Sequence, residues 1–154
     1  MSEETYRIAE WLARAADDPQ QARREWAKQG VTLLRCGQRF DVVRIPAALM
    51  HAAMGETFTA DELHFALGGP VLHNTAEGPY WVFIYGHAGL VWDEGEDTPA
   101  LGKNHYLGVP SLTRTQPPGP HWVVPPRYDG DVCRPETVRR FIARARQQLA
   151  LVEA

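Results

Sequence analysis

Cationic and aromatic side chains gather around two segments in the last third of the chain, YLGVPS and PPGPHWVVPP. Proline pairs bracket the second segment and predict a short strand between them. The side chains near the ends of these two segments that could hold an anion or stack on a flat group are Lys103, His105, Tyr106, Arg114, Thr115, His121 and Trp122. Grouped at one sheet edge, the cations would bind a phosphate or carboxylate, with Tyr106 or Trp122 as the stacking surface. The competing interpretation is a structural histidine beside a strand.

Motifs for other chemistries are missing. The chain has no GxSxG, HExxH or Walker motif and no GxGxxG after a strand. None of its six histidines are paired at i, i+2 or i, i+4, so a zinc site would depend on the fold alone. The acidic loop WDEGEDTP, with Asp93 and Asp97, is typical of a solvated loop rather than a magnesium site. We therefore expect no metal and no cofactor.

The two cysteines, Cys36 and Cys133, have no zinc-type spacing and are interpreted as free thiols, although a long-range disulfide stays open. Arg35 and Arg39 flank Cys36 and could lower the pKa of its thiol. A buried, idle thiol is the favoured interpretation.

Charge is distributed unevenly along a chain whose net charge is -3. Every ionised side chain between 55 and 101 is acidic, whereas Lys and Arg outnumber Asp and Glu from 102 onward. A dipolar protein of this kind can bind an anion on one side while it stays acidic overall. The sequence has no apolar run long enough for a membrane span and no signal peptide, so a cytoplasmic location is expected.

The spacing of apolar residues and the helix-capping residues predict the helices and strands that position these side chains. Residues 1–30 predict two helices, the first capped by Ser2 and the second running from Asp18 to Gly30. VTLLRC and FDVVRIP predict two strands, as a hairpin or as strand–loop–strand. Thr59 and Glu62 predict a capping box.

The remaining segments complete an α+β prediction. PVLHN, PYWVFIYG, LVWDE, HYLGVPS and the segment of His121 predict further strands, and 135–154 predicts an amphipathic helix. We therefore expect a single domain: a helical pair at 1–30, a sheet core at 31–134, and a C-terminal helix at 135–154. The sheet is expected to be mixed or mostly antiparallel, with about five or six short strands packed by the terminal helices.

The segments FDVVRIP, GPVLHN, YLGVP and PPGPHWVVPP resemble small actinobacterial proteins related to the N-terminal domain of bifunctional DNA primase–polymerases. In that archaeo-eukaryotic primase superfamily, a strand carries a histidine that contacts the phosphates of the incoming nucleotide. The resemblance assigns this position to His121. Active members also carry an acidic pair on one strand to hold divalent metals, whereas Asp41 is followed two positions later by Val43.

The resemblance therefore implies an inherited fold with a degenerate active site. The leading hypothesis is a non-catalytic domain that binds a nucleotide, a nucleic acid or a protein partner around His121. A second hypothesis is an interaction or regulatory module, with an apolar patch near Trp81, Trp92 or Trp122, or a homodimer through the C-terminal helix. A third is a metal-dependent enzyme that uses the scattered histidines with Asp93 or Asp97.

Overall fold

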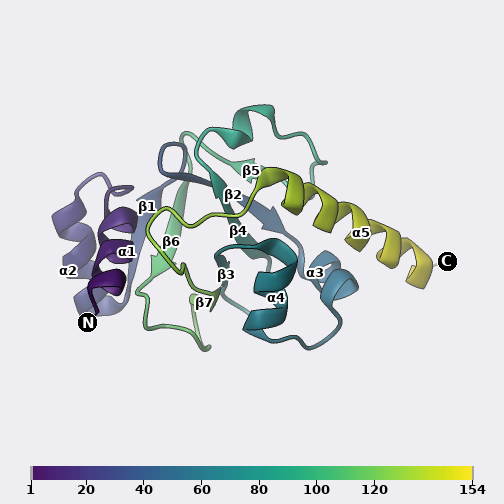
Figure 1. Ribbon diagram of the computed structural model, residues 1–154, viewed down its shortest axis with the longest axis horizontal. Helices are drawn as coiled ribbons and strands as arrows, with labels where there is room; N and C mark the ends of the chain where they lie inside the picture. The colour runs from purple at the N-terminus through teal and green to yellow at the C-terminus, as the bar shows by residue number, and fades with distance from the viewer. Residues whose placement is uncertain (1, 154) are drawn as a thin grey trace.

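The computed structural model describes residues 2–153, which form helices at both ends of the chain and strands between them (Figure 1). The helices are α1 (Glu3–Ala13), α2 (Pro19–Gln29), α3 (Ala47–Met54), α4 (Ala60–Leu67), the short 3-10 helix η1 (Ala88–Val91) and α5 (Pro135–Glu153). The strands are β1 (Val31–Arg35), β2 (Phe40–Ile45), β3 (Val71–His73), β4 (Tyr80–Tyr85), β5 (Ala100–Leu101), β6 (Tyr106–Pro110) and β7 (His121–Val124). Met1 and Ala154, at the outer ends of two predicted ranges, lie outside the described residues.

The strands form two antiparallel sheets, which confirms the α+β fold class. One sheet has five strands in the order β5-β2-β4-β3-β7, and the other consists of β1 and β6. The prediction of a single sheet was therefore too simple. In β1 and β6 one face is buried and the other is open, whereas β2 is buried almost throughout.

Local capping sets the helix ends. The side chain of Ser2 accepts a hydrogen bond from the backbone N–H of Thr5, and Asp18 does the same for Gln20 and Gln21. Gly30 ends α2 with φ +80°, a conformation that only glycine adopts without strain. In α4 both bonds of the Thr59–Glu62 capping box are present. These predictions are confirmed.

The structure decides one strand prediction and corrects another. VTLLRC and FDVVRIP form the expected strand–loop–strand and not a hairpin, because β1 pairs with β6 while β2 pairs with β4 and β5. LVWDE is not a strand: its first residues belong to η1, and Trp92 follows that helix. The indole N–H of Trp92 donates to the carbonyl of Thr98, so the acidic loop folds back on itself instead of extending.

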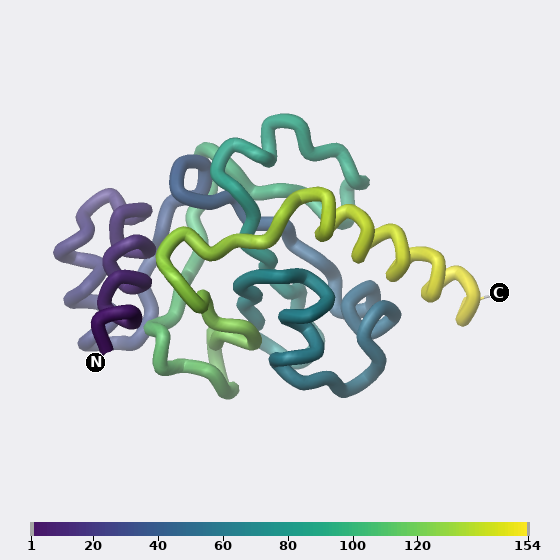
Figure 2. The backbone as a smooth tube through the Cα atoms, in the orientation of Figure 1, coloured from purple at the N-terminus to yellow at the C-terminus, as the bar shows by residue number. Residues whose placement is uncertain are grey.

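The hydrophobic core occupies both faces of the five-stranded sheet. On one face α3, α4 and α5 cover Val43, Val71 and Val82; α5 contributes Phe141. On the other face α1, β1 and β6 cover a second cluster. It includes Phe40, Leu72, Phe83 and Trp122. The tube view places α1 and α2 at one end of the molecule and the end of α5 at the other (Figure 2). Within residues 2–153, no helix combines the length and apolar character needed to cross a membrane.

Candidate binding surface

The predicted anion-binding residues fall into two groups, because β6 separates them. Lys103, His105 and Tyr106 lie at the start of β6, whereas Arg114 follows its end. Tyr106 pairs with Arg35 at one end of β1, and Pro110 pairs with Val31 at the other. Four steps of antiparallel strand separate these ends by about 13 Å. One small anion cannot contact both groups.

Arg114 has a structural role. Its Nη2 donates to the carbonyl of Gln29 at 3.0 Å, which satisfies one of the free carbonyls in the last turn of α2. The guanidinium also packs against Gly30, where any Cβ would collide with it. Thr115 is exposed, and no contact in the described structure gives it a role at this turn.

His121 and Trp122 are both buried. The Nδ1 atom of His121 lies 2.8 Å from the carbonyl oxygen of Gly119, so the neutral ring carries its proton on Nδ1. Trp122 is only 1% exposed; its indole N–H donates to the carbonyl of Pro110, and its ring packs against Phe83. The prediction of Trp122 as a stacking surface is wrong, because its position on β7 turns it into the core.

His121 belongs instead to an aromatic cluster at the edge of the five-stranded sheet. His73 and His121 are paired across β3 and β7, with ring centroids 5.8 Å apart. The ring of His73 stacks on Tyr80 at 3.8 Å, and His51 approaches Tyr80 from α3. Burial lowers the pKa of His73, and the neighbouring His121 and His51 lower it further against the opposing effect of its bond to Gly78. The environment of the cluster therefore disfavours a positive charge on His73.

Lys103, His105 and Tyr106 gain partners that the sequence did not reveal. The turn after β1 lies against the loop before β6: a Cβ at Gly37, where φ is +109°, would meet the backbone nitrogen of Lys103 at 2.8 Å. The N–H of Cys36 donates to the carbonyl of His105 at 2.9 Å. These contacts bring the arginines of the β1 end beside the lysine loop.

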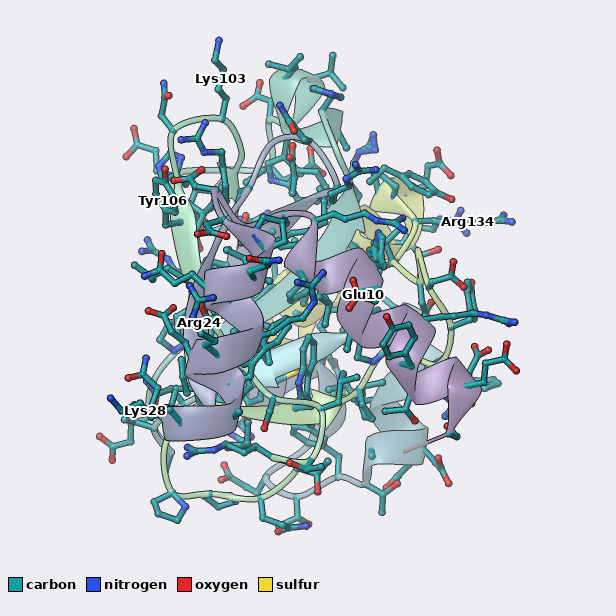
Figure 3. All side chains as sticks on the ribbon, turned by 90° about the vertical axis from the view of Figure 1, so that its left-hand side faces the viewer. Glu10, Arg24, Lys28, Lys103, Tyr106 and Arg134 are labelled. Atoms are coloured by element: carbon teal, nitrogen blue, oxygen red, sulfur yellow. The ribbon has the colours of Figure 1, made fainter. Side chains whose placement is uncertain are left out.

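We call this region the basic end and define it by Arg14, Arg35, Arg39, Lys103 and His105. All five side chains are exposed. Arg14 and Arg35 line one shallow hollow of about 220 Å³ with Gln38, so the end of α1 contributes to the same surface. Lys103 extends from the tip of its loop, and Tyr106 lies below it at the same end (Figure 3).

Tyr106 is a half-exposed platform within the basic end. Tyr106 is 44% exposed. The guanidinium of Arg35 lies 5.3 Å from the centroid of the Tyr106 ring. The Tyr106 hydroxyl accepts from Arg35 at 2.6 Å and donates to Asp17 at 2.9 Å. Asp17 also pairs with Arg35 at 3.2 Å. The contacts hold the ring in place and cancel only part of the local positive charge.

Asp41 is the residue that the resemblance would match to the first acid of the metal-binding pair, and it is inaccessible. The residue is 1% exposed, and its Oδ2 accepts the N–H of Gly89 at 2.7 Å. Its Oδ1 is buried without a partner in the described residues. Val43, at the position of the second acid, is fully buried in the core. Among residues 2–153, no three His, Cys, Asp or Glu side chains are placed to share a metal ion.

Cys36 and Cys133 are both free, as predicted, and both are buried, as was predicted for Cys36. Burial, together with the nearby Asp41, raises the pKa of the Cys36 thiol to about 12. The flanking Arg35 and Arg39 are exposed and do not offset this rise in pKa, so the alternative of an arginine-activated thiol is wrong. Comparisons with protein-family models, with curated proteins and with solved structures found no match.

Proposed function

We propose that the protein is a non-catalytic domain that binds single-stranded nucleic acid at the basic end. The main support is that cations from four segments lie around the exposed ring of Tyr106. These segments are the end of α1, β1, the β1–β2 turn and the loop before β6. Proteins that bind single strands combine a positive surface for the phosphates with aromatic rings on which bases stack. The basic end has both parts.

The distribution of charge supports this proposal. The whole chain carries -3, yet the basic end gathers four Arg and Lys side chains, of which Arg35 pairs with Asp17 and Arg14 lies near Glu10. These cations lie on separate segments, a spread that suits successive phosphates of a strand better than a single phosphate. Arg35, held over the Tyr106 ring, would place one cation directly beside a stacked base.

The proposal excludes phosphoryl-transfer chemistry on geometric grounds. Two-metal catalysis needs carboxylates that reach the substrate. Asp41 lies beneath Gly89 and Gly102, and the second position of the acidic pair is the core residue Val43. We therefore propose that the protein binds nucleic acid but does not catalyse the phosphoryl transfer of the family that it resembles.

The test measures the salt dependence of binding to a labelled oligothymidylate by fluorescence anisotropy. If Arg14, Arg35, Arg39 and Lys103 each neutralise one phosphate, log K falls with log salt at a slope of about -2.8, or about 50-fold between about 50 and 200 mM. The double variant Arg39→Ala/Lys103→Ala should have a slope of about -1.4 and lose about sevenfold over that range. Arg24→Ala on α2 is the control, because it removes an exposed charge away from the basic end (Figure 3).

Three outcomes count against the proposal. Absence of binding at low salt refutes it directly. An equal loss in the Arg24→Ala control shows that only net charge matters. A nucleoside triphosphate that binds as tightly as the oligomer identifies a nucleotide site and overturns the assignment to a strand.

A further inference from the structure

The outer edge of β1 contains one residue whose backbone groups are free for pairing with another chain. In an antiparallel ladder, alternate residues direct their N–H and C=O toward the partner strand. Ser111 donates to Gly30, and Cys36 donates to His105, so the even-numbered residues of this segment face β6. The odd-numbered residues, Val31, Leu33 and Arg35, therefore direct their backbone groups away from the sheet.

The neighbours of Leu33 on this edge have partners inside the protein. The N–H of Arg35 donates to the carbonyl of Ala15 at 2.8 Å, and the carbonyl of Val31 accepts from Nε2 of Gln29 at 2.9 Å. Within residues 2–153, no partner is found for the N–H or the C=O of Leu33. Its side chain is 63% exposed. An exposed strand edge of this kind can pair with an added strand.

A hollow of about 340 Å³ lies beside this edge, between α2 and β1. Its acidic lining residues are Asp17, Asp18 and Glu25, and Leu33 also lines it. Asp17 is paired with Arg35, whereas Asp18 caps α2 and Glu25 accepts a bond from the hydroxyl of Thr32. The groups that donate to Asp18 and Glu25 are uncharged, so both carboxylates keep their negative charge. The hollow therefore favours a cation.

We propose that this edge binds an extended peptide segment of another protein that carries an arginine or lysine. One peptide residue would exchange two backbone hydrogen bonds with Leu33, and an adjacent basic side chain would enter the hollow toward Asp18 and Glu25. Side chains alternate along a strand, so an apolar residue of the peptide would cover the exposed Leu33 side chain. This interaction is independent of nucleic-acid binding at the basic end.

A second copy of the chain is the less suitable occupant. Antiparallel pairing of β1 with β1 of another molecule, centred on Leu33, would bring the carboxylates of both hollows to the same gap. Like charges placed opposite one another across a strand pair are destabilising. Charge complementarity therefore selects a basic peptide.

The probe is a fluorescein-labelled peptide of alternating valine and arginine with blocked ends, measured by anisotropy against the full chain. Its matched control has the same sequence with alternate backbone nitrogens methylated, which keeps the charge and removes strand pairing. We expect the methylated peptide to bind about tenfold more weakly or worse, because methylation removes the N–H that would donate to Leu33 and the added methyl group obstructs the second backbone bond. Equal affinity of the two peptides would overturn the proposal.

Two variants test the protein side. Glu25→Gln/Asp18→Asn keeps the bonding geometry and removes two charges, and it should weaken peptide binding about tenfold. Leu33→Pro removes the outward N–H and the leucine side chain but no bond of the β1–β6 ladder, so it should weaken peptide binding while leaving that ladder intact. Arg39→Ala/Lys103→Ala should leave peptide binding unchanged, which separates this site from the basic end.

The remaining outcomes are also decisive. Unchanged affinity in Glu25→Gln/Asp18→Asn would refute the acidic hollow as the recognition element, and this variant does not depend on Leu33→Pro folding. A concentration-dependent dimer in light scattering that Leu33→Pro abolishes would identify a second copy as the occupant and refute the peptide.

Discussion

Replacing Trp122 with phenylalanine separates a core role from a ligand-contact role. The indole N–H donates to the carbonyl of Pro110 at 3.1 Å, and the ring is buried against Phe83. Phenylalanine leaves that buried carbonyl without a partner, which costs about 1–3 kcal/mol. The smaller ring leaves a partly filled cavity that adds about 1 kcal/mol. We therefore expect Trp122→Phe to lower the free energy of unfolding by about 2–4 kcal/mol.

Urea denaturation followed by far-UV circular dichroism measures this loss. With an m-value of about 2 kcal/mol/M, the midpoint should fall by about 1–2 M. Trp81→Phe is the matched control, because Trp81 is only half-buried and should shift the midpoint much less. Folded Trp122→Phe should bind the oligonucleotide as the parent does. An unchanged midpoint combined with lost binding would show that Trp122 contacts a ligand, and would refute its assignment to the core.

Three further predictions concern pH, the thiols and a helix cap. Because the pKa of His73 is lowered in the folded state, the unfolded chain binds more protons below about pH 6.5, and stability should fall as the pH drops through that value; His73→Gln should flatten this dependence in denaturation midpoints, and an unchanged slope would contradict it. The buried thiols of Cys36 and Cys133 should react with Ellman's reagent only after unfolding, whereas fast reaction of the native protein would disagree with their burial. Thr59→Ala should lower stability by about 1 kcal/mol, with Thr59→Ser nearly neutral; equal midpoints for both would exclude a contribution from the capping box.

The two proposed sites lie next to each other but have opposite charge. Arg35 and Tyr106 belong to the basic end, and Tyr106 also lines the acidic hollow beside β1. The Asp17–Arg35 pair stands at the boundary between them. A partner with both a phosphate strand and a basic peptide could contact the two sites together, and the variants named above measure each contribution separately.

The acidic loop has a structural explanation. Arg146 of α5 donates to Asp97 at 2.7 Å and to the carbonyl of Glu94, and Thr98 donates to the same carbonyl. These contacts fasten the loop to α5. One of the loop's carboxylates, that of Asp97, therefore has a structural partner.

The other sequence-based hypotheses concerned apolar surface. The proposed patch near Trp122 does not exist, because that ring is buried. Trp92 is partly covered by the guanidinium of Arg139 at 5.7 Å. On α5 the exposed apolar residues are Leu151 and Val152, close to its end, while Phe141 and Ile142 pack into the core. A homodimer through α5 stays a prediction.

Local chemistry determined much of this protein. Ser2, Asp18 and Thr59 cap helices through side-chain bonds to nearby backbone N–H groups, and Gly30 ends one through its positive φ. Such signals act over three or four residues, so the sequence alone specifies them. Short β-branched, apolar or aromatic runs likewise predicted the strands at β2, β4 and β6, and the bracketing prolines predicted β7.

Only the tertiary structure decided which segments meet. Pairing of β1 with β6 joins residues 71 to 79 positions apart, and it places Arg35 at the end of β6 that follows Lys103 while Arg114 lies beyond the other end. The same pairing leaves Leu33 on an open edge, and the placement of β7 beside β3 buries Trp122. These outcomes depend on the packing of both sheet faces at once, and no short stretch of sequence contains that information.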